Sequence, residues 1–260
     1  MLSFVYVLPG FMLVFIRLTA FFLTAPIFSL KTIPSMYKIG LSFFLAIIAY
    51  PLVKPHELIH FDWFYVYLIL KEVVVGLLIG FIGTLLLSAV QAAGSLIDLV
   101  LGLSMANVYD PMTGAQSPLT GNFKFMLTML FILSVNGHHL LIDGILSSYH
   151  VVPLDRMATA IGNGNVSAFL VRALSYMFLS GLLLAAPMVS SMFVVDVALG
   201  IVAKTVPQLN IFVVGMPAKI LAGFLILIVV FPGYFYVMSR LLDYLFSSMA
   251  QLIDLMGAAP

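Results

Sequence analysis

The chain has 260 residues, of which 63% are hydrophobic and only 8% are Asp, Glu, Lys or Arg. Ordinary soluble domains are about 45–50% apolar and about 25% charged, so this composition predicts a membrane-class protein whose surface meets lipid or other protein. The 11 basic and 10 acidic residues nearly cancel and lie scattered, which disfavours nucleic-acid binding, and the absence of cysteine excludes disulfides and thiolate chemistry.

Long apolar stretches recur along the chain, and most approach or exceed the roughly 20 residues needed to cross a hydrocarbon core. In chain order they are 4–30, 39–53, 64–90, 123–142, 169–202 and 218–246. We therefore predict an all-α, multi-helix membrane-class fold with six spans, the second of which is short. The N-terminus lacks the basic residues and cleavage site of a removable signal, so we expect it to begin the first helix.

The interruptions between these stretches carry Pro, Gly, Asn or charge, and none is long enough for a separate soluble domain. The third stretch is expected to continue through 91–106 as a second helical segment. Breaks are also expected at Ala185-Ala186-Pro187 and across 207–217. Because prolines remove backbone donors, we expect the helices to be kinked and arranged as hairpins.

Glycines at helical spacing predict close contacts between helices, because small residues allow two backbones to approach. The positions expected to serve this packing are Gly76, Gly80, Gly83, Gly94 and Gly102.

Seven ionisable residues lie within or near the ends of the apolar stretches. A charge at mid-bilayer depth costs at least about 2.5 to 3.5 kcal/mol, so each is expected to face protein or water. A subunit of a larger complex would pair these charges internally or with partners, whereas a transporter would line a path with them. The residues are Arg17, Lys71, Glu72, Asp98, Asp143, Arg172 and Asp196.

No pattern in the sequence indicates catalysis or a cofactor. His139 and Asp143 are four residues apart, a spacing compatible with a shared metal, but no third ligand is apparent and histidines at helix ends commonly bond to backbone. The motifs of hydrolases, nucleotide-binding proteins and dinucleotide-binding proteins are all missing. We therefore expect no enzyme activity, no metal and no cofactor.

The polar segment 107–118, Asn-Val-Tyr-Asp-Pro-Met-Thr-Gly-Ala-Gln-Ser-Pro, lies between a helix rich in small residues and a long apolar stretch. Turn-forming residues of this kind are typical of a surface loop. The alternative is a re-entrant plug buried in protein.

Several landmarks, taken in order, resemble the FliR family of flagellar biosynthetic proteins, called SctT in virulence-associated secretion systems. They are Arg17 and Pro26, the region from Gly94 to Pro111, Asn136-Gly137-His138, Ala185-Ala186-Pro187, and Pro207-Gln208-Leu209-Asn210-Ile211-Phe212 to Pro217. The resemblance extends over essentially the whole chain. It implies a subunit of the type III export gate in the bacterial inner membrane and flagellar basal body.

The resemblance also implies partners, a division of the chain and a gate. The partners are FliP and FliQ, which assemble with the chain, and FlhB, which contacts it; the cargo is unfolded flagellar protein. Residues 1–165 are expected to be FliP-like and 166–260 to form a FliQ-like hairpin. The plug residues implied are Met105, Asn107, Tyr109, Asp110, Pro111 and Met112.

Three alternatives remain open at this stage. The first is a secondary transporter of a small solute, with Arg17, Asp98, Asp143 and Asp196 along its path. The second is an intramembrane hydrolase using one of the two adjacent histidines. The third concerns topology, because the family resemblance implies kinked helices stacked above the bilayer in place of conventional spans.

Overall fold

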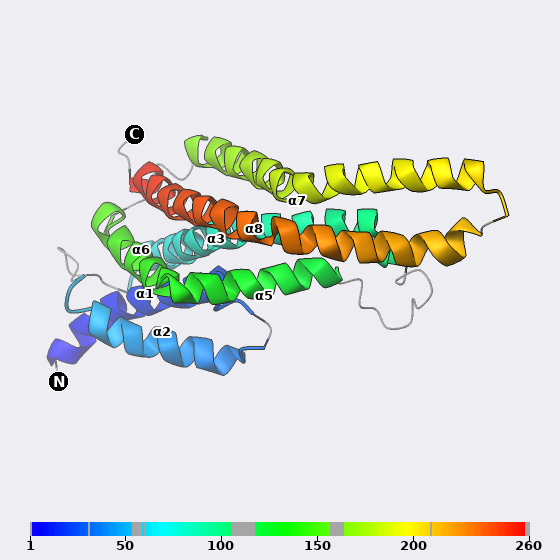
Figure 1. Cartoon of the computed structure of the whole chain (residues 1–260). Helices are drawn as coiled ribbons and strands as arrows, with labels where there is room; N and C mark the ends of the chain where they lie inside the picture. Colours follow the sequence, from blue (N-terminus) through cyan, green and yellow to red (C-terminus); the bar gives the residue numbers. More distant parts are fainter. Residues whose placement is uncertain are drawn as a thin grey trace. The chain divides into compact units, whose positions relative to one another are not determined.

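The computed structural model describes residues 2–30, 32–53, 59, 61–105, 118–156, 164–208 and 210–257. These residues form seven α-helices and one 3-10 turn and include no strand, which confirms the all-α fold (Figure 1). The elements are α1 Leu2–Thr24, α2 Ser35–Ala49, α3 Trp63–Leu101, η1 Leu103–Met105, α5 Leu119–Ser134, α6 Gly137–Val151, α7 Asn165–Thr205 and α8 Ile211–Gly257.

The predicted number of six spans is too high. Among the described residues, four helices (α1, α3, α7 and α8) are long and apolar enough to cross a membrane, and a fifth span arises only if α5 and α6 are counted together. Helix α2 has 15 residues, fewer than a straight span requires.

The apolar stretch 123–142, expected to be one helix, is two helices bent by 71°. Asn136 adopts a left-handed conformation with φ of 56°, which Asn tolerates better than most residues. At Gly137, a Cβ would lie 2.7 Å from Cγ2 of Ile132, so the bend leaves no space for a side chain there. The adjacent Asn and Gly together permit this turn.

The break expected at Pro187 is absent, because Pro187 lies inside the continuous 41-residue helix α7. The break expected across 207–217 is present but shorter, since α7 ends at Thr205, α8 begins at Ile211 and Pro217 lies inside α8. The expected helical continuation beyond residue 90 is confirmed, since α3 runs unbroken to Leu101 and η1 follows it.

Contacts divide the chain into two compact units. The first contains Met1–Leu86, Ile132–Leu174 and Asp243–Pro260, and the second contains Leu87–Phe131 and Ser175–Leu242. In the second unit, α7 and α8 are the arms of a helical hairpin (Figure 1). The expected division at 165 and 166 coincides with the start of α7 and concerns likeness to FliP and FliQ, so it stays a prediction.

In the first unit, α1 packs against both α2 and α3. Rings of α1 meet α2 edge to face, with centroids 5.7 Å apart for Phe11 and Phe43. Leu13, Leu18 and Phe21 of α1 are fully buried, and Ala20 and Phe21 lie against Gly76 of α3. This packing places the middle of α1 beside the second and third turns of α3, where the charged residues of both helices lie.

Candidate functional site

A fully buried ion pair joins the middle of α1 to α3. The guanidinium of Arg17 donates to both carboxylate oxygens of Glu72: Nε to Oε2, and Nη2 to Oε1 at 3.0 Å. Neither side chain has any exposed surface. Two parallel bonds of this kind fix orientation as well as attraction, so the pair sets the register of α1 on α3.

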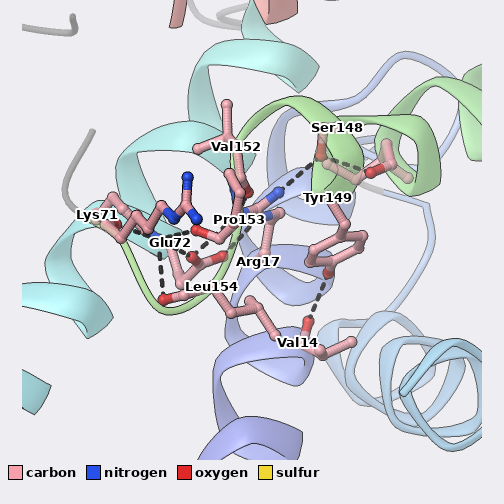
Figure 2. A network of polar contacts seen from close by, with 11 residues as sticks. Val14, Arg17, Lys71, Glu72, Ser148, Tyr149, Val152, Pro153 and Leu154 are labelled. Carbon is pink, nitrogen blue, oxygen red and sulfur yellow. Dashed lines mark hydrogen bonds and ion pairs between the residues drawn. The ribbon is translucent and has the colours of Figure 1, made fainter. Parts of the chain in front are cut away.

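Lys71 makes a second ion pair with the same carboxylate, with Nζ 2.9 Å from Oε1 of Glu72. One carboxylate therefore serves two cations, and Asp155 is a further carboxylate that interacts electrostatically with Lys71. Nζ of Lys71 also donates to the backbone carbonyls of Pro153 (2.6 Å), Leu154 (3.1 Å) and Arg156 (3.1 Å). Figure 2 shows these contacts around the labelled Glu72.

Arg17 also binds the end of α6. Its Nη1 donates to Oγ of Ser148 at 2.9 Å and its Nη2 to the carbonyl of Val152 at 2.8 Å (Figure 2). Its guanidinium lies 4.2 Å from the centre of the Tyr149 ring, and the Tyr149 hydroxyl donates to the carbonyl of Val14. Cations are favourable at a helix C-terminus, where carbonyls lack helical donors. The network therefore caps α6 while joining it to α1 and α3.

Glycines form the seam between α1 and α3. A Cβ at Gly76 would lie 2.9 Å from Cβ of Ala20 and 3.1 Å from the backbone nitrogen of Phe21. At Gly80, a Cβ would lie 2.8 Å from both the nitrogen of Ala25 and the carbonyl oxygen of Phe21, and at Gly83 it would meet the Pro26 ring. Without these approaches Arg17 and Glu72 would not meet.

The second unit contains a separate polar cluster. The carboxylate of Asp98, in the last turn of α3, accepts the backbone N–H of Thr120 at 3.2 and 3.1 Å. Lys124 is buried and has an electrostatic interaction with Asp98. The Tyr234 hydroxyl of α8 donates to the carbonyl of Lys124 at 2.9 Å and is bonded to the hydroxyl of Thr128 at 2.6 Å. The cluster therefore links α3, α5 and α8.

The other two packing glycines also belong to the second unit. A Cβ at Gly94 would collide with the backbone of Gly121. Gly102 lies beyond the end of α3 with φ of +79°, a conformation that favours glycine, and a Cβ there would be 3.5 Å from Sδ of Met216.

The other three of the seven ionisable residues singled out from the sequence are not buried. Asp143, Arg172 and Asp196 are exposed on the chain, which agrees with the expectation that each faces protein or water only if water or a partner subunit meets them. Asp196 forms an ion pair with Lys219 across the α7–α8 hairpin, at 2.6 Å. Pairing of Asp143 and Arg172 with partner chains stays a prediction.

The expected gate residues are placed only in part. Met105 ends η1, whereas Asn107, Tyr109, Asp110, Pro111 and Met112 lie outside the described residues. His138 and His139 begin α6 with ring centroids 4.1 Å apart. Across the part of the chain that the structure describes, no three His, Asp or Glu side chains come together as a metal site.

Sequence reasoning missed Ser148, Tyr149, Lys124 and Tyr234. Lys124 carried a usable signal, because it is a charge at the start of an apolar stretch. The others are ordinary residues for a helix, and their roles follow from partners more than 100 positions away in sequence.

The fold and these contacts define a class: a helical membrane protein whose buried charges hold helices together. The family model described as "Bacterial export proteins, family 1" matches residues 8–245. The flagellar biosynthetic protein FliR of Bacillus subtilis (strain 168) is 44% identical over 251 residues, covering 96% of this chain and 97% of that protein. FliR of Escherichia coli (strain K12) is 30% identical, covering 92% and 90%.

A translocation protein is related as well: the Yop proteins translocation protein T of Yersinia pestis is 29% identical over 231 residues, covering 88% of this chain and 85% of its own length. The chain belongs to the FliR family of bacterial export proteins. It is a non-enzymatic membrane component of the flagellar export apparatus, homologous to components of type III secretion, and resides in the inner membrane.

Proposed function

We propose that the chain is a structural and gating subunit that builds the export conduit together with FliP-type and FliQ-type subunits and contacts an FlhB-type protein. The cargo is unfolded flagellar protein. The subunit does no chemistry: it contributes wall to the conduit and keeps it shut until the export machinery engages cargo.

One observation carries this proposal: the chain leaves most of its C-terminal hairpin uncovered. In the most apolar 18-residue stretch of each helix, the share buried within the chain is 22% for α7 and 11% for α8. The same share is 61% for α3. Helix α7 also exposes Arg172 and Asp196, whose contact with lipid would be unfavourable. A surface that is apolar yet carries such charges fits partner subunits better than lipid.

The transporter alternative loses its proposed path. The Arg17 guanidinium donates hydrogen bonds to Glu72 and to the Val152 carbonyl at the end of α6, and the Asp98 carboxylate accepts one from the Thr120 N–H. These two side chains lie in different compact units. No observation favours the hydrolase alternative.

Native mass spectrometry of the tagged chain, purified in mild detergent from its own membrane, tests the assembly. We expect a defined hetero-oligomer containing FliP-type and FliQ-type chains. A photo-crosslinking residue at Val229, which is 79% exposed on α8, should capture one of these chains. The matched control is the same residue at the fully buried Met238 of the same helix. Recovery of a monomer without protein adducts at Val229 would contradict the assembly.

The gate itself is proposed to be the segment 107–118, because the family resemblance implies a plug there. Methionines and a tyrosine suit a seal around varied cargo, since flexible thioethers adapt their shape. Deleting 107–118 is expected to leave assembly intact and to make the membrane leaky to ions. Ion flux in cells expressing the full complex measures this, and failure of the deleted chain to assemble would reassign the segment to scaffolding.

A further inference from the structure

The first unit contains a cleft of about 390 Å³ where the start of α7 meets the end of α8 (Figure 1). Its lining combines a cation, an anion, an amide and a phenol with two apolar side chains. The lining residues are Phe169 and Arg172 of α7 and Tyr244, Gln251, Asp254 and Leu255 of α8. Pockets that bind small ligands have roughly 300–1,000 Å³ of volume and place a few polar groups among apolar ones. The cleft therefore has the size and the lining of a ligand site.

Arg172 and Asp254 supply opposite charges to this cleft, and both are exposed. Within the described part of the chain, neither takes part in an ion pair. A guanidinium binds a phosphate through parallel N–H···O bonds, and a carboxylate accepts hydrogen bonds from an ammonium. A small ligand that carries both a phosphate and an ammonium would therefore satisfy the two side chains together.

A second cleft, of about 230 Å³, shares Asp254 with the first and lies between α6 and α8. Its lining is mostly apolar and includes Leu140 and Val151 of α6 and Phe246 and Ile253 of α8. Because Asp254 lines both clefts, a ligand whose ammonium meets Asp254 can extend an apolar chain along the second cleft, where its burial is favourable. The two clefts together therefore suit an amphiphile with a zwitterionic end.

The first cleft also lies at a suitable depth for the headgroup of a membrane lipid. Helix α7 carries no charged residue between Arg172 and Asp196, and α8 carries none between Lys219 and Arg240. Each uncharged stretch reaches the roughly 20 residues that cross a hydrocarbon core. Arg172 and Asp254 lie at or beyond the same end of these stretches, away from the α7–α8 connection. In a hairpin that crosses the bilayer, the cleft is therefore at the level of the headgroups.

We propose that this cleft binds a zwitterionic phospholipid, with the headgroup phosphate on Arg172, the headgroup ammonium on Asp254 and an acyl chain along the second cleft. Arg172 is unfavourable against acyl chains but favourable against a phosphate, so the proposal explains why an arginine is exposed on an apolar helix. The proposal concerns only the base of the hairpin. It does not depend on the conduit role, since partner subunits would cover the hairpin beyond the cleft.

Native mass spectrometry of the chain, purified in mild detergent with the subunits that accompany it, counts bound lipid after phosphatidylethanolamine or phosphatidylglycerol is added. Both lipids have a phosphate, but only phosphatidylethanolamine has an ammonium, so the wild type should bind phosphatidylethanolamine more tightly. Arg172→Gln should weaken binding of both lipids roughly two- to fivefold, as expected for loss of a partly exposed ion pair. Asp254→Asn should weaken binding of phosphatidylethanolamine alone and so remove the preference.

Asp143→Asn is the matched control, because it removes an exposed carboxylate of the same unit that lines neither cleft. It should bind both lipids as the wild type does. Wild-type binding without a preference, or an unchanged preference in Asp254→Asn, would overturn the proposal. Free phosphoethanolamine lacks acyl chains and should bind more weakly; equal binding would assign the cleft to a soluble ligand and also overturn it. A photo-crosslinking residue at Gln251 should capture lipid, and capture of a partner chain there would assign the cleft to that chain instead.

Discussion

Replacing Glu72 by Gln should be among the most damaging single changes to this chain. The amide keeps the shape of the side chain but removes the one negative charge between Arg17 and Lys71, leaving two buried cations together. Breaking a buried ion pair by removing one partner costs about 3–5 kcal/mol, a large part of the stability of a typical protein. We expect a strongly lowered melting temperature, or no folded protein, when the variant is purified in mild detergent.

Asp143→Asn is the control, because it makes the same chemical change at an exposed carboxylate on α6. It should melt as the wild type does. Adding Lys71→Met to Glu72→Gln should recover part of the lost stability, since it removes one of the two buried cations that lose the Glu72 carboxylate. Equal melting of Glu72→Gln and Asp143→Asn would show that the buried network contributes little to folding.

The second large effect is expected at Gly76, where even one methyl group should separate α1 from α3. The added Cβ in Gly76→Ala would approach the Ala20 side chain and the backbone of α1, which have no flexible end that could move aside. Overpacking of this kind typically costs about 1–3 kcal/mol. Thermal unfolding of the purified chain measures this loss, and the displaced α1 should also weaken the Arg17–Glu72 pair.

Gly200→Ala is the control, because it should leave the melting temperature unchanged or raise it, where Gly76→Ala should lower it. Gly200 lies inside α7, and a Cβ there would meet no atom within 4 Å. Alanine in a helix interior is more stable than glycine by roughly 0.5–1 kcal/mol, so this variant should melt at the same or a higher temperature. If both variants are destabilised alike, close packing at the α1–α3 seam does not account for the effect of Gly76→Ala.

Some of the fold could be read from the sequence because it depends on local composition. The apolar stretches predicted most of the helices, and the turn-forming residues near Pro207 predicted the connection between α7 and α8. Two errors came from Pro187 and Pro217, which were expected to break helices. A helix continues through proline when neighbouring groups and a local adjustment satisfy the freed carbonyl, and the sequence alone does not show this.

The candidate site was predictable as a set of residue types and not as a set of contacts. Burial of Arg17, Lys71, Glu72 and Asp98 follows from the cost of placing charges in apolar helices. The same argument also allows the exposed positions of Asp143 and Arg172, because it requires only that a charge face protein or water. Tyr149 was missed because its role depends on a distant segment, whereas Lys124 could have been singled out as a charge at the start of an apolar stretch.

The sequence by itself determined the class, the helices and the family, because composition, periodicity and ordered motifs are properties of the chain in one dimension. Only the tertiary structure decided that Glu72 pairs with a residue 55 positions away, that α6 ends on Arg17 and Lys71, and that Asp98 caps α5. Burial creates the demand for a counter-charge or a hydrogen bond, but any of several donors or acceptors would satisfy it. The choice among them is made by which helices pack together, and here by glycines that let α1 reach α3.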